Sequence, residues 1–312
     1  MSELFRALAA LAEPPTGETA RLAGALDLGP PPSADEYTRL FVFQLYPYAS
    51  VYLGPEGMLG GEARDRVAGF WRALGQPPPA EADHLAVMLA LYARISEFEE
   101  GEAEESRRDG WRRARRAFFW EHLLSWLPFY LLKLSDLCEP RPASGPSPER
   151  RDADDARGRG DEAASFYQRW AELLGRALRE EATRVGPQET LSAHLRAAPP
   201  VADPRVHGAD EFLQTLLAPA RSGLILTRAD LARAARRLDL PARAGERKFI
   251  LKSLLSQDPA ALLGWLKHEA DHAAERHRRE HVWLGPVARA WEQKARAAST
   301  LLHSVSVADV DA

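Results

Sequence analysis

The sequence predicts an all-helical protein, and three observations lead to that prediction. Apolar residues recur with the spacing of one helical face along most of the chain. No segment alternates apolar and polar residues over any length in the period of a β-strand, and β-branched residues are sparse. Helix-start signals, such as Asp258 before Pro259, precede several apolar stripes. We therefore expect a bundle of packed helices.

The first part of the chain contains the longest periodic segments. We expect helices over residues 36–45, 84–98, 111–134 and 163–182, and a break in the third at Pro128. The apolar stripe of the helix at 36–45 comprises Tyr37, Leu40, Phe41, Gln44 and Leu45. The apolar stripe of the helix at 84–98 comprises Leu85, Met88, Leu89, Tyr92 and Ile95. The stripe of the last comprises Phe166, Trp170, Leu173, Leu174 and Leu178.

Two stretches interrupt this pattern and suggest a domain organisation. Residues 139–162 are rich in Pro, Gly, Ser and charge, which predicts a disordered insertion. Residues 188–207 contain several prolines and predict a linker. The chain would then consist of a domain at 1–187 and a helical module of unknown role at 208–312.

The C-terminal module carries its own helix signals. Thr227 and Asp230 have the spacing of a capping box, in which each side chain bonds the backbone of the other. Further helices are expected over residues 249–255 and 260–277, the last opened by Asp258 and Pro259.

Composition excludes several classes of protein. The 312 residues carry a formal net charge of −4, and the arginine-rich run 107–116 follows an acidic run that can neutralise it, which argues against a nucleic-acid binder. A single cysteine, Cys138, fits a reducing compartment. No export signal opens the chain, and its most apolar stretch, 123–137, is too short and polar for membrane insertion. These features predict a cytoplasmic protein.

One segment suggests an enzyme instead. His268, Glu269 and His272 match H-E-x-x-H, in which two histidines one helical turn apart bind zinc and the glutamate acts as base. Asp271 places a charge inside this motif, and no third ligand follows at the usual spacing; Glu292 is a strained candidate. A zinc metallopeptidase with metal ligands His268 and His272 is therefore the alternative hypothesis. No phosphate loop, nucleophile elbow or cysteine pair is present, so no cofactor is predicted.

An aromatic segment and an acid–histidine segment predict a different function. Residues 47–53 read PYASVYL, and residues 81–84 read EADH just before a long apolar helix. Together they suggest an apolar groove with polar groups at its rim, which suits binding of an extended peptide. Asp83 also stands where an acid caps the following helix, and both roles can hold.

The ordered set of motifs resembles the TorD/DmsD family of redox-enzyme maturation chaperones over about the first 185 residues. The matching residues are Tyr37-x-x-Leu40-Phe41, Pro47-Tyr48-x-Ser50-Val51-Tyr52, Phe70-Trp71, Asp83-His84-Leu85, Phe118-Phe119-x-Glu121-His122-Leu123-x-x-Trp126 and Phe166-Tyr167. The resemblance implies a non-enzymatic cytoplasmic chaperone. It would bind the twin-arginine signal peptide, or the body, of a molybdopterin oxidoreductase catalytic subunit until the cofactor is inserted, before export.

The resemblance also assigns a site. It implies that Asp83 and His84, with Glu81 nearby, bind the peptide's basic end, and that Tyr37, Leu40, Phe41 and Tyr52 line the groove. Two departures affect these contacts: Glu81 stands where the family usually has proline, and Met88 where it often has glutamate. The C-terminal module would cover the groove, contact the client's body or mediate formation of a homodimer. Glu121, His122 and Trp126 are expected to support helix packing.

Overall fold

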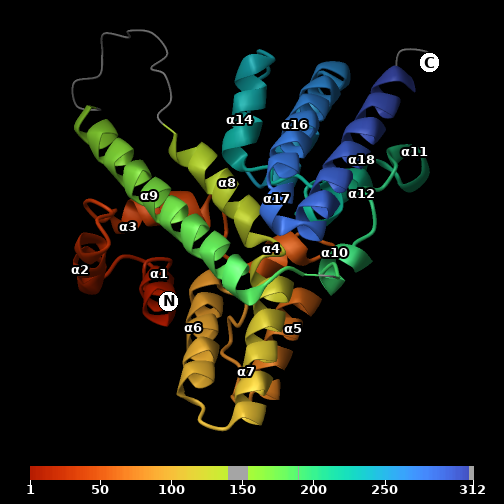
Figure 1. Cartoon of the computed structure of the whole chain (residues 1–312). Helices are drawn as coiled ribbons and strands as arrows, with labels where there is room; N and C mark the ends of the chain where they lie inside the picture. The colour runs from red at the N-terminus through yellow and green to blue at the C-terminus, as the bar shows by residue number, and fades with distance from the viewer. Residues whose placement is uncertain (140–153, 189, 309–312) are drawn as a thin grey trace. The chain divides into compact units, whose positions relative to one another are not determined.

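The computed structural model describes residues 1–139, 154–188 and 190–308, with the side chains of 154–165, 307 and 308 left out of the description. Over these residues the chain is helical and contains no β-strand, so the predicted fold class is confirmed (Figure 1). None of the described helices has the length and apolar character needed to span a bilayer.

The chain divides into two compact units, each assembled from stretches that are distant in sequence. The first unit comprises residues 1–47, 84–116 and 127–184, and the second comprises 48–83, 117–126 and 185–312. The second unit thus takes residues from both sides of the linker predicted at 188–207. The three-part division predicted from sequence stays a prediction, and each unit is described by itself below.

The first unit is built on aromatic and aliphatic side chains of α1 (Ser2–Ala10), α6 (Leu85–Gly101) and α9 (Asp154–Val185). Phe5 packs edge-on against Tyr92 with ring centroids 5.1 Å apart, and the indole N–H of Trp170 donates to the Leu8 carbonyl at 3.2 Å. These contacts place α1 and α9 around α6, whose first half is apolar and whose every predicted stripe residue is buried. The helices are α1 (Ser2–Ala10), α2 (Gly17–Ala25), α3 (Ala34–Tyr37), η1 (Thr38–Val42), α6 (Leu85–Gly101), α7 (Glu105–Phe118), α8 (Leu127–Cys138) and α9 (Asp154–Val185).

The second unit packs the C-terminal helices with two stretches from the first half of the chain. Its longest helices, α16 (Pro259–Arg279) and α18 (Pro286–Ala308), lie side by side (Figure 1). The short helix α4 (Ala49–Leu53) contacts both α5 (Gly61–Ala73) and α13 (Pro219–Ser222). The predicted capping box forms, since Thr227 N donates to Asp230 at 2.7 Å and Asp230 N donates to Thr227 at 3.3 Å. The helices are α4 (Ala49–Leu53), α5 (Gly61–Ala73), η2 (Phe119–Leu123), α10 (Ala193–Ala197), α11 (Pro204–His207), α12 (Ala209–Leu216), α13 (Pro219–Ser222), α14 (Arg228–Arg237), α15 (Arg247–Leu255), α16 (Pro259–Arg279), α17 (His281–Leu284) and α18 (Pro286–Ala308).

The predicted break at Pro128 was placed wrongly. The helical path changes at 124–126, after the π-helical turn η2, and Pro128 lies inside the first turn of α8. A proline is tolerated there because the first N–H groups of a helix have no partner within that helix. The expected helix at 36–45 likewise becomes α3 followed by the π-helical turn η1, closed by Phe43 N donating to the Thr38 carbonyl at 3.2 Å.

The insertion predicted at 139–162 falls largely on residues outside the description. Residues 140–153 are not described, and α9 begins at Asp154, ahead of the predicted start at residue 163. Further along α9, Phe166, Trp170, Leu174 and Leu178 are buried as the spacing predicts.

Candidate functional site

Asp83 is buried, with 2% of its surface exposed, and caps a helix other than the one it precedes. Its carboxylate Oδ2 accepts the backbone N–H of Ser50 at 3.0 Å, and its carbonyl accepts that of Ala49 at 3.0 Å. These are among the first N–H groups of α4, which have no acceptor within that helix. The expectation that Asp83 caps the following helix was therefore wrong; the carboxylate instead holds the start of a helix that lies 33 positions earlier.

His84 is the residue that caps α6. Its ring Nδ1 accepts the Ala86 N–H at 3.3 Å, its carbonyl accepts the Met88 N–H at 2.9 Å, and the side chain is buried. Nδ1 also lies 3.5 Å from a carboxylate oxygen of Glu13. The two contacts exclude each other, because a neutral Nδ1 accepts from Ala86 and only a protonated one donates to Glu13. The 3.3 Å bond fits the capping role.

The aromatic residues expected to line a groove lie in the cores of their own units. In the first unit, the Tyr37 hydroxyl donates to the Ala12 carbonyl at 3.3 Å, and Phe41 packs edge-on against a neighbouring ring. In the second unit, Tyr52 stacks on Trp126 with ring centroids 5.0 Å apart and planes at 8°. Leu40 is half-buried and Glu81 is exposed. Tyr37, Leu40, Phe41 and His84 belong to the first unit, and Tyr52, Glu81 and Asp83 to the second. Their contact with a peptide stays a prediction.

Ser50 is the site residue that the sequence alone did not single out. It is fully buried and uses three groups at once. Its N–H donates to Asp83, its Oγ accepts the Gly60 N–H at 3.0 Å, and its carbonyl accepts the Gly54 N–H at 2.8 Å. Ser50 belongs to the motif at residues 47–52, but a serine in the first turn of a short helix is common and does not by itself predict these bonds.

Glu121, His122 and Trp126 serve packing in the second unit. Glu121 accepts the Ala193 N–H at 2.8 Å, and the Trp126 indole donates to the His122 carbonyl at 2.8 Å. Burial, helped by the nearby positive charge of Arg66, lowers the pKa of His122 to about 3, so its ring stays neutral at neutral pH. These contacts tie the segment around α10 to η2.

The sequence of residues 9–130 is similar to a known protein family. This stretch matches the family model described as nitrate reductase delta subunit. We call this stretch, which comprises 122 of the 312 residues, the family segment. This family segment contains every residue of the predicted peptide site, from Tyr37 to His84.

Two curated relatives share part of the chain. It is 35% identical over 102 residues to the chaperone protein TorD of Vibrio vulnificus strain CMCP6, and 34% identical over 102 residues to that of strain YJ016. Each alignment covers 30% of this chain, and the chain spans 45% of the length of each relative. No solved structure matches.

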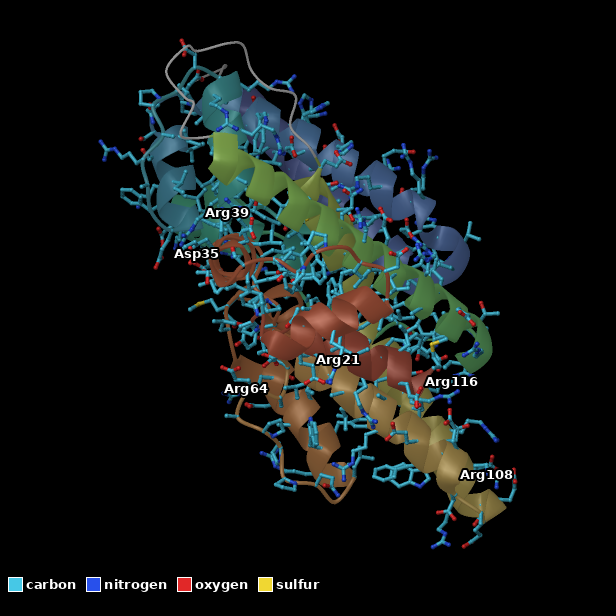
Figure 2. The ribbon with its side chains drawn as sticks, turned by 90° about the vertical axis from the view of Figure 1, so that its left-hand side faces the viewer. Arg21, Asp35, Arg39, Arg64, Arg108 and Arg116 are labelled. Atoms are coloured by element: carbon cyan, nitrogen blue, oxygen red, sulfur yellow. The ribbon has the colours of Figure 1, made fainter. Side chains whose placement is uncertain are left out.

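Within the family segment, the acidic run and the arginine-rich run pair with each other. Glu99 lies 3.2 Å from Arg112 and 3.0 Å from Arg115, and Arg115 lies 3.7 Å from the buried Glu181. The Arg108 guanidinium donates to the Glu102 carbonyl at 2.7 Å; Figure 2 shows Arg108 and Arg116 toward opposite ends of α7. The charges of this helix are thus largely matched within the protein, as the alternation of acidic and basic runs indicates.

The H-E-x-x-H segment lies on α16, outside the family segment. His268 and His272 are exposed on α16, Glu269 pairs with Arg233 at 3.1 Å, and Glu292 lies 2.8 Å from His281. Among the described residues, no group of three or more His, Cys, Asp and Glu side chains is arranged to hold a metal ion. Metal binding by His268 and His272 stays an alternative prediction.

Proposed function

We propose that this chain is a non-enzymatic maturation chaperone for a molybdopterin oxidoreductase. It binds the twin-arginine leader or the body of the catalytic subunit in the cytoplasm and holds it until the cofactor is inserted. The observation that carries this proposal is the match of residues 9–130 to the nitrate reductase delta subunit family, supported by the partial identity with two TorD chaperones.

The geometry around the Asp–His pair favours a role in peptide binding over a role in bond cleavage. Asp83 and His84 are buried and bonded to backbone N–H groups, which suits residues that hold binding elements in place. Glu81 is exposed two residues earlier and offers a carboxylate to an arginine of the leader. An exposed pair of this kind contributes less than about 1 kcal/mol, so most of the affinity must come from apolar contact, at about 25 cal/mol per Å² buried.

Calorimetric titration with a synthetic leader tests the proposal. The peptide carries two adjacent arginines followed by an apolar segment of about 15 residues. We expect saturable binding to the wild-type chain and binding at least about tenfold weaker to the Asp83→Asn/His84→Asn variant, about 1.4 kcal/mol. Asparagine at both positions keeps a helix-capping acceptor, so circular dichroism should be nearly unchanged, but it removes the negative charge of Asp83 that attracts the basic end of the leader.

The chain provides a matched control for this experiment. Asp271→Asn/His272→Asn changes the same dipeptide in the same way on an exposed stretch of α16 and should bind the leader like wild type. Co-purification of a molybdopterin oxidoreductase subunit from the native host is the independent check. A wild-type chain that binds neither the leader nor such a subunit would refute the proposed function.

A further inference from the structure

Residues 105–116 of α7 are held in the first unit with little apolar burial. None of these residues is buried, whereas α6, which precedes them by three residues in the hairpin, buries every residue of its stripe (Figure 1). The Trp111 ring packs on that of Phe98 with centroids 4.8 Å apart, but both side chains are only half-buried. A helix segment without a buried residue gains little from the hydrophobic effect, so polar contacts must hold it in place.

One arginine of this segment reaches a buried carboxylate. The Glu181 side chain of α9 is 3% exposed, and the Arg115 guanidinium lies 3.7 Å from it and 3.0 Å from Glu99 of α6. The Tyr92 hydroxyl donates to Glu181 at 2.5 Å. Burial and the negative charge of Glu181 raise the pKa of Tyr92, so the hydroxyl keeps the proton that it donates. Arg115 therefore joins α6, α7 and α9 at one charged cluster.

The charged contacts at the other end of the segment are exposed. Arg107 pairs with Glu104 at 2.9 Å, and Arg108 pairs with Glu105 at 2.9 Å. Such exposed pairs contribute little to stability, because water and salt screen them. A buried charge that loses its partner is strongly destabilising instead. Among the charged contacts described for this segment, the one between Arg115 and Glu181 is the most buried, so its loss should have the largest effect.

We propose that residues 105–116 form an arm that Arg115 latches onto α6 and α9, and that this arm opens as one unit while the rest of the first unit stays folded. α7 leaves the first unit after Arg116 and ends at the buried Phe118, so the arm stays attached at that end. Elements with few buried contacts are the ones that open locally. Opening separates Arg115 from Glu99 and Glu181 and so turns a neutralised cluster into an acidic one.

Hydrogen exchange of the full chain, followed by mass spectrometry at rising urea below the unfolding transition, tests the opening in wild type. The amides of residues 105–116 should have protection factors at least about tenfold lower than those of residues 88–95 in α6. Their opening free energy should hardly depend on urea, because a local opening exposes little surface. Equal protection and equal urea dependence of the two segments would overturn the inference.

A core variant separates opening of the arm from unfolding of the whole unit. Leu8→Val removes a methylene from a fully buried side chain of α1. The closed and open forms of the arm share that core, so this variant should lower the protection of residues 88–95 and leave that of residues 105–116 unchanged. Equal losses in both segments would mean that the arm opens only when the unit unfolds, and the inference would be overturned.

Three arginine variants test the latch itself. Arg115→Gln removes the charge from the buried cluster and should lower the protection of residues 105–116 by a further factor of about ten or more. Arg107→Gln makes the same change at an exposed arginine of the same helix and should alter it by less than about threefold. Arg115→Lys keeps the positive charge and should recover part of the loss.

The outcomes of these variants are distinguishable. Equal effects of Arg115→Gln and Arg107→Gln overturn the latch, and so does an Arg115→Lys variant no better protected than Arg115→Gln, since packing and not charge would then hold the arm. An Arg115→Gln chain that does not fold would make the cluster part of the core and also overturn it. Leader binding enters none of these measurements, so their failure leaves the proposed function standing.

Discussion

Two Asp–His dipeptides in this chain are placed in opposite surroundings. At Asp83–His84 both side chains are buried, and each accepts a backbone N–H at the start of a helix. At Asp271–His272 both side chains are exposed in the middle of α16, where Asp271 is held by Lys267 at 2.8 Å and Ser299 at 2.6 Å. The first pair takes part in forming helix ends, whereas the second lies on a helix that forms without it.

This difference shows that the structural role of a dipeptide depends more on its burial and its backbone hydrogen-bond partners than on its amino-acid sequence. A buried acceptor that is removed leaves a backbone N–H without a partner, which costs about 1–3 kcal/mol. A solvated side chain that is removed leaves water in its place, and the effect is usually within about 0.5 kcal/mol. The predictions below contrast buried and exposed members of the same residue types.

The largest effect is expected from His277, a buried histidine on the same helix as His272. Its Nε2 donates to the Gly223 carbonyl at 2.9 Å, and burial lowers its pKa to about 4. Because an unfolded histidine titrates near pH 6.5, the unfolded chain binds a proton between about pH 6.5 and 4 that the folded chain does not. The free energy of unfolding should therefore fall as the pH drops through this window.

Urea unfolding at about pH 7 and about pH 5 measures this effect. One histidine with these pKa values lowers the free energy of unfolding by about 2 kcal/mol between the two conditions. His277→Gln keeps a donor for the Gly223 carbonyl and should remove that share of the pH dependence, whereas His272→Gln should leave it unchanged. His122 and His194, whose pKa values burial lowers to about 3 and about 4, supply the dependence that remains. Equal slopes in wild type and His277→Gln would contradict the assignment.

Asp83 should show the next largest effect. Asp83→Ala leaves the Ser50 N–H buried without its acceptor and should lower the free energy of unfolding by about 2 kcal/mol. Asp83→Asn retains an oxygen that can accept this bond and should cost less. Asp271→Ala is the exposed counterpart and should stay within about 0.5 kcal/mol. Urea unfolding midpoints at neutral pH compare the three variants. An equal decrease in the free energy of unfolding for Asp83→Ala and Asp271→Ala would contradict the expected difference between the buried and the exposed aspartate.

The features that the sequence predicted well depend on residues close together in the chain. The helix 85–101 follows from apolar spacing, because its buried stripe of Leu85, Met88, Leu89, Tyr92 and Ile95 repeats over a few turns. The Thr227–Asp230 box follows from a spacing of three residues. Such signals involve only residues close together in the chain, so they can be recognised without knowledge of the tertiary structure.

The features that escaped prediction depend on partners that are distant in sequence. Nothing near Asp83 indicates that its carboxylate bonds Ser50, 33 positions earlier, or that His84 takes the cap of α6 instead. Tyr37, Phe41 and Tyr52 read equally well as groove or core, because both environments select large apolar rings. Spacing gives the face of a helix but not what covers that face.

His84 offers a smaller test of the same contrast. His84→Ala removes the Nδ1 acceptor for the Ala86 N–H and should cost about 1 kcal/mol, the usual value of a helix cap. His84→Asn supplies another capping oxygen and should recover most of that loss. Thermal unfolding of the two variants side by side gives the difference; a His84→Asn variant as unstable as His84→Ala would mean that ring packing, not capping, makes the contribution.

The smallest effect is expected at His268 and His272. Both are exposed, and no third ligand accompanies them among the described residues, so His268→Ala/His272→Ala should change the free energy of unfolding by less than about 0.5 kcal/mol. Zinc bound by the folded state alone would stabilise the protein in proportion to the logarithm of its concentration, about 2.7 kcal/mol at one hundred times its dissociation constant. Midpoints measured with zinc and with EDTA should therefore coincide for wild type and for the variant. A zinc-dependent shift that disappears in His268→Ala/His272→Ala would restore the metal site and with it the peptidase hypothesis.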